Sequence, residues 1–291
     1  MTVAATPDLV AAATAAGTAV LAFNVVSIEH AEGIAAGVER ADSAALLQIS
    51  ENTIVFHGGR ITPLLAACAQ IATESTAPLG IHLDHLQDMT LLSEAINTAA
   101  ALGAGSIMID AAHLPYLANI ERTRTLAGAA HAAGLWVEAE LGEIGGKGGA
   151  HALGARTDPE EAAAFVAATG VDALAVAVGS SHAMTTREAQ LDHDLISRLA
   201  GSVQVPLVLH GSSGVPDGDL RSAVEAGIRK VNVGTALNIA FTGAVRDALS
   251  ASPSAPDPRP YLKAGREAVS DTVAALCRVV AVAPAGKVGP R

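Results

Sequence analysis

The chain has 291 residues, of which 50% are hydrophobic and only 2% aromatic, and its formal net charge is -11. Its 18 basic residues are scattered along the sequence, which argues against a nucleic-acid-binding face or a polybasic membrane patch. The sequence contains no apolar run of the roughly 18 residues that a membrane span needs, and its start lacks the basic residues of a signal peptide. Cys68 and Cys277 are not spaced as in a disulfide framework. The sequence therefore predicts a soluble cytoplasmic protein.

Short apolar runs bounded by turn residues predict eight strands. In chain order they span Ala19–Val25, Ala45–Ser50, Leu79–His85, Ser106–Asp110, Leu135–Leu141, Ala173–Gly179, Pro206–Ser212 and Lys230–Thr235. Stretches rich in Ala and Leu, with helical spacing, separate these runs, and several begin with capping residues such as Thr6-Pro7-Asp8.

Strict alternation of strands and helices predicts a parallel sheet, and eight repeats over this length predict one (β/α)8 barrel domain across residues 1–291. An open doubly wound sheet is the alternative, but the first strand ends in Phe23-Asn24-Val25-Val26, without a GxGxxG motif. The Pro-rich stretch Ser252–Pro260 is predicted to be a surface linker to a final helix, roughly Tyr261–Val280.

Polar side chains gather at the predicted carboxyl ends of the strands, where barrels of this type assemble their active sites. They are Asn24, Ser50, Asp84, His85, Asp110, Glu138, Glu140, His182, His210 and Asn232. Burying such groups without partners would cost several kcal/mol each, so we expect them to share one site. Three imidazole ligands with a vacant position are typical of catalytic zinc. The sequence spacing permits the three histidines to meet but does not show that they do.

Five segments resemble class II fructose-bisphosphate and tagatose-bisphosphate aldolases. In order, they read His82-Leu-Asp-His85, Ser106-Ile-Met-Ile-Asp110, Val137-Glu-Ala-Glu-Leu-Gly142, Val208-Leu-His-Gly-Ser-Ser-Gly214 and Lys230-Val-Asn-Val-Gly-Thr235. The resemblance extends from Ala22-Phe-Asn24 to Asp257-Pro-Arg259, which is nearly the whole chain. It implies a metal-dependent enzyme that cleaves a ketose phosphate reversibly into dihydroxyacetone phosphate and an aldehyde.

The resemblance also implies roles for matching positions. The ligands of the divalent cation would be His85, His182 and His210. Asp110 and Glu140 would line a second metal position, and Asp84 would be the acid/base. Zn2+ is the expected cation, with Mn2+ or Co2+ as alternatives. A monovalent cation is a possible second cofactor.

Further positions would bind the sugar phosphate. They are Asn24, Ser50, Gly211, Ser213, Asn232, Thr235 and Arg259. The turns after strands seven and eight would hold the phosphate, because backbone N–H groups at strand-to-helix junctions favour an anion. Members of the family are dimers or tetramers, so we expect a homodimer or homotetramer in which Arg259 serves a neighbouring site.

The sequence departs from the family after the fifth strand. Family members carry an acidic cluster there, whereas Gly145–Arg156 contains no carboxylate. Its glycines predict a mobile lid, in which Lys147 and Arg156 meet an anionic group and His151 moves a proton. Ala183 also replaces a glycine that usually follows the second histidine ligand. Fructose and tagatose bisphosphates, a sulfo-sugar phosphate and a keto-deoxy acid phosphate are therefore all candidate substrates.

Two other functions are considered. A Schiff-base aldolase needs a lysine in the barrel mouth; Lys147 could reach it from a loop, whereas Lys230 opens its predicted strand and is expected to face the wrong end. A non-catalytic barrel that binds sugar phosphates is the second alternative. The presence of Asp84 beside the ligands favours catalysis, because a purely metal-binding subunit does not need that carboxylate.

Overall fold

The computed structural model describes residues 2–141, 156–180 and 186–281. Eight parallel strands close into a barrel in chain order, and the last pairs with the first. They are β1 (Val20–Asn24), β2 (Ala45–Ser50), β3 (Leu79–Leu86), β4 (Ser106–Ile109), β5 (Trp136–Leu141), β6 (Ala173–Val176), β7 (Leu207–Leu209) and β8 (Ile228–Val233). The closed barrel confirms the (β/α)8 prediction and excludes the open sheet.

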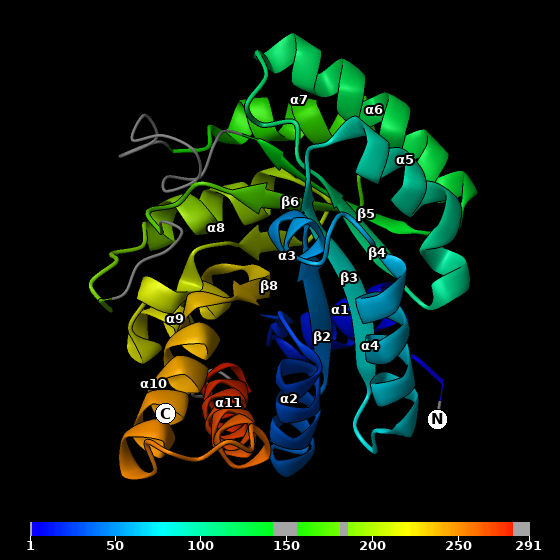
Figure 1. Cartoon of the computed structure of the whole chain (residues 1–291). Coiled ribbons are helices and arrows are strands. Elements are labelled where there is room, and N and C mark those ends of the chain that lie inside the picture. The colour runs from blue at the N-terminus through cyan, green and yellow to red at the C-terminus, as the bar shows by residue number, and fades with distance from the viewer. Residues whose placement is uncertain (1, 142–155, 181–185, 282–291) are drawn as a thin grey trace, which may run out of the picture.

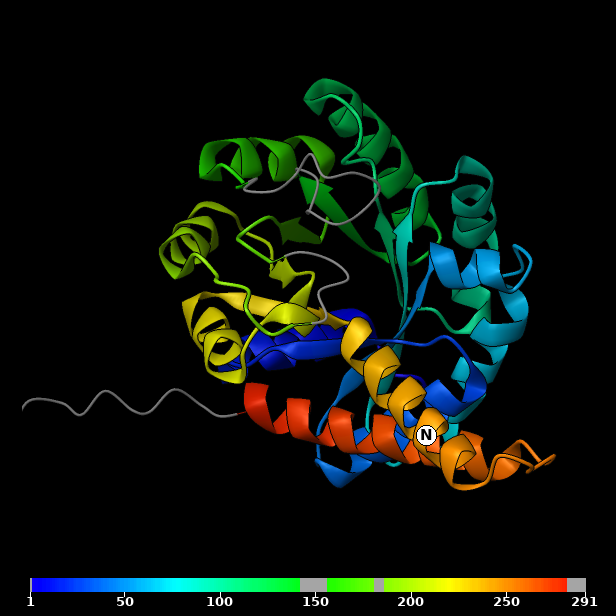
Figure 2. The same ribbon diagram turned by 60° about the vertical axis from the view of Figure 1, so that its left-hand side comes forward.

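Helices surround the barrel (Figures 1 and 2). They are α1 (Thr6–Ala16), α2 (Ile28–Arg40), α3 (Glu51–Phe56), α4 (Thr62–Glu74), α5 (Met89–Thr98), α6 (Tyr116–Ala132), α7 (Pro159–Thr169), α8 (His193–Ser202), α9 (Asp217–Ala226), α10 (Thr235–Ala251) and α11 (Arg259–Val280), with short 3-10 turns η1 (Ala100–Leu102) and η3 (Ser212–Gly214). The predicted final helix is confirmed as α11, which packs against α2 and α10. Among the described helices, none is long and apolar enough to cross a membrane.

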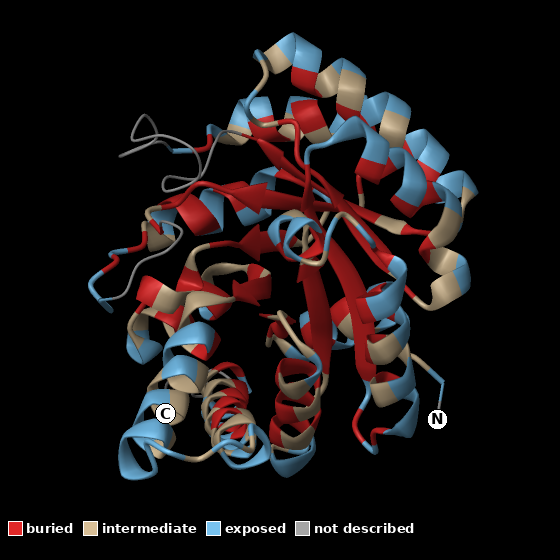
Figure 3. Cartoon of the chain, in the orientation of Figure 1, coloured by how far each residue is buried: buried red, intermediate tan, exposed pale blue. Residues whose placement is uncertain are grey.

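The strands of the barrel are buried (Figure 3). Alternation along them divides the apolar side chains between the inside of the barrel and the layer between strands and helices. On β1, Leu21 and Phe23 belong to the large apolar cluster between strands and helices, whereas Val20 and Ala22 belong to a small cluster that includes Val10 of α1. The interior therefore holds an apolar layer at the end of the barrel covered by α1. Polar residues occupy the other end of the interior, and these make up the site described below.

Helix α11 approaches α2 closely because two glycines face it. A Cβ on Gly37 would lie 2.6 Å from the carbonyl oxygen of Ser270 and 2.7 Å from Cβ of Val273. A Cβ on Gly33 would lie 2.7 Å from another backbone oxygen of α11. Any side chain at these positions would force the two helices apart.

We expect Gly37→Ala to lower the free energy of unfolding by about 1–3 kcal/mol, the usual cost of overpacking, as measured by urea denaturation. Gly128→Ala is the matched control, because Gly128 is exposed on α6 and a Cβ there meets nothing within 4 Å. The control should be stabilised by up to about 1 kcal/mol, since alanine favours helix more than glycine does. Equal effects of the two substitutions would contradict the packing described for α11.

Candidate active site

Strand β3 supplies two adjacent residues to the barrel interior. In a regular strand, Asp84 and His85 would point to opposite faces. His85, however, has a positive φ of 52°, and the register between β3 and β4 shifts between Leu83 and Leu86. A non-glycine residue in this region of φ is strained and is held there by its surroundings. This local break in the strand lets both side chains reach the same cluster.

A carboxylate holds one nitrogen of His85. His85 Nδ1 lies 2.9 Å from Asp110 Oδ2, and the same oxygen accepts a hydrogen bond of 2.9 Å from Gln87 Nε2. The His85 ring also lies edge-on to the ring of His210, with 4.6 Å between centroids. A carboxylate that receives the N–H of one ring nitrogen directs the lone pair of the other to a metal. His85 is therefore arranged to bind a cation through Nε2.

His210, directly after β7, is held through Nε2, whereas His85 is held through Nδ1. Its Nε2 lies 2.9 Å from Glu138 Oε1, and its Nδ1 lies 3.9 Å from Glu140 Oε2. Burial lowers the pKa of His210, although the hydrogen bond to Glu138 acts to raise it. The imidazole is therefore neutral near pH 7, which is the form that binds a metal.

Two amides hold the carboxylate of Asp84. Gln48 Nε2 donates to Oδ2 at 3.1 Å and Asn232 Nδ2 donates to Oδ1 at 3.3 Å. Burial alone would raise the pKa of Asp84, but the nearby imidazoles, that of His85 first, together with the Lys230 ammonium outweigh it, and the net direction is downward. Asp84 is therefore ionised and able to accept a proton near neutral pH.

The described residues contain overlapping groups of side chains that could hold a metal ion. Within each group the candidate ligand atoms lie within 4.8 Å of one another. The two groups that include His85 are Asp84, His85 and His210, and His85, Asp110 and Glu140. Imidazole nitrogen and carboxylate oxygen are donors that suit Zn2+, so the residues fit the predicted cation. The third predicted histidine ligand, His182, lies outside the described residues.

The predicted substrate residues occupy the same end of the barrel, except one. Asn24 ends β1 and accepts a hydrogen bond of 2.6 Å from Gln48, while Ser50 caps α3 by accepting from the N–H of Thr53. Gly211 has a φ of 66°, which a glycine adopts easily. Arg259 instead begins α11, with 88% of its side chain exposed, and pairs with Asp257.

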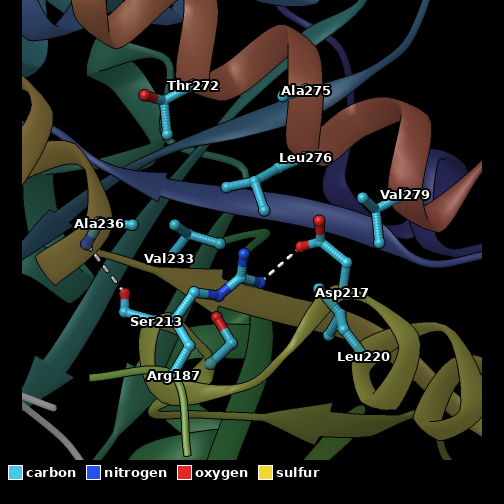
Figure 4. Close-up of a pocket in the computed structure, with 11 residues that line it drawn as sticks. Arg187, Ser213, Asp217, Leu220, Val233, Ala236, Thr272, Ala275, Leu276 and Val279 are labelled. Carbon is cyan, nitrogen blue, oxygen red and sulfur yellow. Dashed lines mark hydrogen bonds and ion pairs between the residues drawn. The ribbon is translucent and has the colours of Figure 1, made fainter. Parts of the chain in front are cut away.

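The two proposed phosphate turns meet at a hydrogen bond, in which Ser213 Oγ accepts from the N–H of Ala236 at 3.0 Å, one residue after Thr235 opens α10. Beside it lies a pocket of about 240 Å³ between η3, β8 and α11 (Figure 4). Arg187 lines this pocket and pairs with Asp217. The pocket is thus lined by residues of the two turns, including Ser213 and Ala236, and by no histidine of the cluster.

The predicted placement of Lys230 is wrong. Strand β8 begins at Ile228, so Lys230 is an inner residue of the strand, and its fully buried ammonium lies 2.8 Å from Glu138 Oε2. Gln48, which also contacts Asp84, did not stand out in the sequence. Both could have been found from alternation, because Lys230 shares a strand face with Asn232, and Gln48 shares one with Ser50.

A third buried histidine of the cluster, His82, makes stability depend on pH. Its Nδ1 lies 2.8 Å from Ser106 Oγ, and burial lowers its pKa to about 3, with the Lys230 ammonium acting in the same direction. In the unfolded chain a histidine titrates near pH 6.5, so below that pH the unfolded state binds a proton that the folded state does not. The stability from neutral His82 is therefore present above about pH 6.5 and is lost as the pH falls toward 3.

We expect the unfolding free energy of the metal-free protein to fall between pH 7 and pH 5, by about 2 kcal/mol on account of His82 alone. The unfolding free energies of the wild type and of His82→Gln are measured by urea denaturation at pH 7 and pH 5. The glutamine of the variant cannot titrate in this range. The fall should be smaller in the variant by about that amount. An identical pH dependence in both proteins would show that His82 is not held neutral in the folded state.

In (β/α)8 barrels the active site lies at the carboxyl ends of the strands, and the buried imidazoles and carboxylates found there in this chain are side chains of the kinds that bind metals. The chain matches the model of the family described as fructose-bisphosphate aldolase class-II over residues 4–284. It therefore belongs to this family, whose members are metal-dependent, and it is an enzyme of the carbon–carbon lyase class.

Solved structures agree with this assignment. The YdjI aldolase from Escherichia coli K12 is 30% identical, with 96% of this chain and 97% of that chain covered and a TM-score of 0.81. A putative fructose-1,6-biphosphate aldolase from Coccidioides immitis is 28% identical, with 94% and 95% covered and a TM-score of 0.84. The fructose-bisphosphate aldolase from Campylobacter jejuni, at 21% identity, 94% and 93% coverage and a TM-score of 0.79, supports the fold alone.

Proposed function

We propose that this enzyme cleaves a ketose 1-phosphate or 1,6-bisphosphate, of the fructose or tagatose type, reversibly into dihydroxyacetone phosphate and an aldehyde. The observation that carries the proposal is the position of Asp84. Its carboxylate is ionised, held by two amide donors, and lies 3.8 Å from His85 Nε2, the nitrogen arranged to bind the cation. An acid/base beside a metal site is what retro-aldol cleavage needs.

His85 and His210, together with His182, would hold the divalent cation, and Asp110 and Glu140 would line a second position for it. When bound, Zn2+ supplies Lewis-acid stabilisation of the negative charge that develops on the ketone fragment. We propose Zn2+, with Mn2+ or Co2+ as alternatives.

Asp84 then performs the proton transfer. Its carboxylate takes the proton of the C4 hydroxyl while the C3–C4 bond breaks, so that C4 becomes the aldehyde carbon and the bonding electrons pass to C3 of the ketone fragment. C3 must then take up a proton for dihydroxyacetone phosphate to form, and we propose His151 as the donor of that proton. In condensation, Asp84 returns its own proton to the aldehyde oxygen. Asp84 must lie within hydrogen-bond reach of that oxygen for either direction.

The sugar phosphate would be bound by both phosphate turns and by the residues around them. The proposed contacts are Asn24, Ser50, Gly211, Ser213, Asn232 and Thr235. The hydrogen bond between Ser213 Oγ and the N–H of Ala236 supports this proposal, because it joins the two turns beside the N-terminus of α10, where backbone N–H groups favour an anion. We propose that Arg259 serves the site of a neighbouring subunit in a homodimer or homotetramer.

The experiment that tests the function is a screen for aldol cleavage with Zn2+-loaded protein. The substrates are ketose 1-phosphates that differ in C4 configuration and in the group at C6, including phosphate, sulfonate, carboxylate and hydrogen. We expect dihydroxyacetone phosphate to form from one C4 epimer in preference to the other. Absence of cleavage across the whole set would contradict the proposed reaction.

Arg156 offers a specific test of the group at C6, whereas the other two lid residues, Lys147 and His151, lie outside the described residues. Arg156 is exposed just before α7, and a Cβ built on Gly179, beyond β6, would lie 3.3 Å from its Nη2. Its guanidinium therefore lies near the end of the barrel where substrate would enter, and we propose that it binds an anionic C6 group.

We expect Arg156→Ala to raise KM for a C6-anionic ketose phosphate roughly tenfold, the value of one charge-assisted hydrogen bond. Since this binding is common to ground and transition states, kcat should be unchanged. The 6-deoxy analogue is the internal control, and its KM should not change. Steady-state kinetics with both substrates check the prediction, and equal effects on the two would assign Arg156 no role at C6.

A further inference from the structure

Beneath the acid/base carboxylate, one lysine contacts three side chains. The ammonium of Lys230 lies 2.8 Å from Glu138 Oε2, 2.6 Å from Asn232 Oδ1 and 3.5 Å from Gln48 Oε1. An ammonium group has three N–H donors and no acceptor. All three neighbours therefore turn an oxygen toward Lys230, and this fixes where their other polar atoms point.

The two amides turn their N–H groups to Asp84. Asn232 donates to one oxygen of this carboxylate and Gln48 to the other. An amide can rotate by 180° with almost no change of shape, so its direction depends on its partners. Rotation of either amide would place N–H groups against the Lys230 ammonium, which has no acceptor to offer. Lys230 thus keeps the donor of Asn232 on Asp84. For Gln48 it acts together with Asn24, whose Oδ1 accepts a hydrogen bond of 2.6 Å from the same Nε2.

This direction matters most while Asp84 carries the substrate proton. A protonated carboxyl group is a donor, and a rotated amide would accept its proton in a hydrogen bond beneath the site. Because Lys230 occupies the carbonyl oxygens of Asn232 and Gln48, neither amide can act as that acceptor. The proton of Asp84 is then directed to the substrate oxygen.

The remaining contact of Lys230 supports the metal site. Glu138 turns Oε2 to Lys230 and Oε1 to His210 Nε2, at 2.9 Å. His210 therefore donates through Nε2 and presents its Nδ1 lone pair to the cluster. Lys230 and Glu138 are both fully buried, so each charge depends on the other for compensation.

We propose that Lys230 is a positioning residue that, through Asn232 and Glu138, sets the direction of proton transfer and of the metal-binding nitrogen. The proposal rests on the aldolase function proposed above. It gives the buried lysine a role without a covalent step, since the nitrogen that a Schiff base would need is held by three oxygens.

The test must separate loss of a buried charge from loss of hydrogen-bond direction. Lys230→Met alone would leave Glu138 charged and buried, so it is combined with Glu138→Gln, in which the new amide still offers an oxygen to His210. Lys230→Gln with Glu138→Gln is a second pair that keeps polar groups at both positions. The matched control is Lys263→Met, which removes an exposed lysine of α11 from its ion pair with Glu267.

We expect both double variants to fold, as judged by circular dichroism, and to bind Zn2+ roughly 10–100-fold more weakly in calorimetric titration of metal-free protein. At saturating Zn2+, their kcat should fall about 10²-fold because the proton carrier is misdirected, whereas KM changes by less than about threefold. Glu138→Gln alone leaves the buried Lys230 ammonium without its carboxylate, so its fold is checked first by circular dichroism. In the folded variant Lys230 still contacts Asn232, so Zn2+ affinity should fall but kcat should not. Lys263→Met should change neither quantity.

A kcat within about threefold of wild type in a folded, Zn2+-saturated double variant would overturn the proposal. An equal fall of kcat in Glu138→Gln would do the same, because loss of the ion pair would then explain it. Failure of both double variants to fold would assign Lys230 a purely structural role and overturn it too. If the wild type cleaves no ketose phosphate, the proposed function fails instead, and the Zn2+ titrations still test the His210 contact.

Discussion

Removal of the divalent cation is expected to abolish aldol cleavage, and added Zn2+ is expected to restore it. The negative charge that develops on the ketone fragment needs a strong electrophile. Around Asp84 the described cluster offers the neutral imidazole of His210, and its one ammonium, that of Lys230, is already paired with Glu138. The measurement is the rate of dihydroxyacetone phosphate release after dialysis against a strong chelator, and again after titration with Zn2+, Mn2+ or Co2+.

The complementary experiment is reduction with borohydride in the presence of substrate. A Schiff-base enzyme would be trapped as a covalent lysine adduct. Lys230 is the described lysine that would carry such an adduct, because it lies inside the barrel. We expect no mass increase on intact protein. Full activity of verified metal-free protein, or an adduct on any lysine, would rule out the metal-dependent mechanism for this chain.

Replacement of Asp84, the proposed acid/base, is expected to lower kcat strongly. Asp84→Ala should lower kcat about 10²–10⁴-fold, the usual contribution of a general acid or base, while the protein keeps its metal. The physical reason is that the imidazoles of His85 and His210 are oriented by other carboxylates, Asp110 and Glu138, and not by Asp84. Steady-state kinetics and metal analysis of the same preparation check both parts.

Asp84→Asn is the matched control for shape, because the amide fills the same space but cannot take up a proton. It should be as inactive as the alanine variant. Retention of more than about a tenth of the wild-type kcat in either metal-loaded variant would lie outside the usual range for an acid/base and would move that role to another group.

Much of the fold was readable from the sequence, because strands and helices leave local periodic patterns. β2 was predicted to the residue, and α11 was predicted to within two residues of its start. The end of β6 was predicted too long, since the apolar pattern continues through Ala177 and Val178 into a loop whose backbone no longer pairs in the sheet. The end of β7 was also predicted too long, because the strand was extended through the polar turn His210–Ser212. Asp84, His85 and His210 stood out because polar residues in place of apolar ones at strand ends have a cost that only a site explains.

The amino-acid sequence by itself therefore determined the barrel and the end of it at which buried histidines and carboxylates gather. Only the tertiary structure decided how the polar atoms of these side chains are directed, because β3, β5 and β8 bring together residues that are far apart in the sequence. The positive φ of His85 puts neighbouring side chains into one cluster against the strand alternation. Strand β8 begins at Ile228, two residues before its predicted start, so Lys230 lies within the strand and its side chain points inward to Glu138. A hydrogen bond depends on distances and angles between such strands, and these exist only once the barrel has closed.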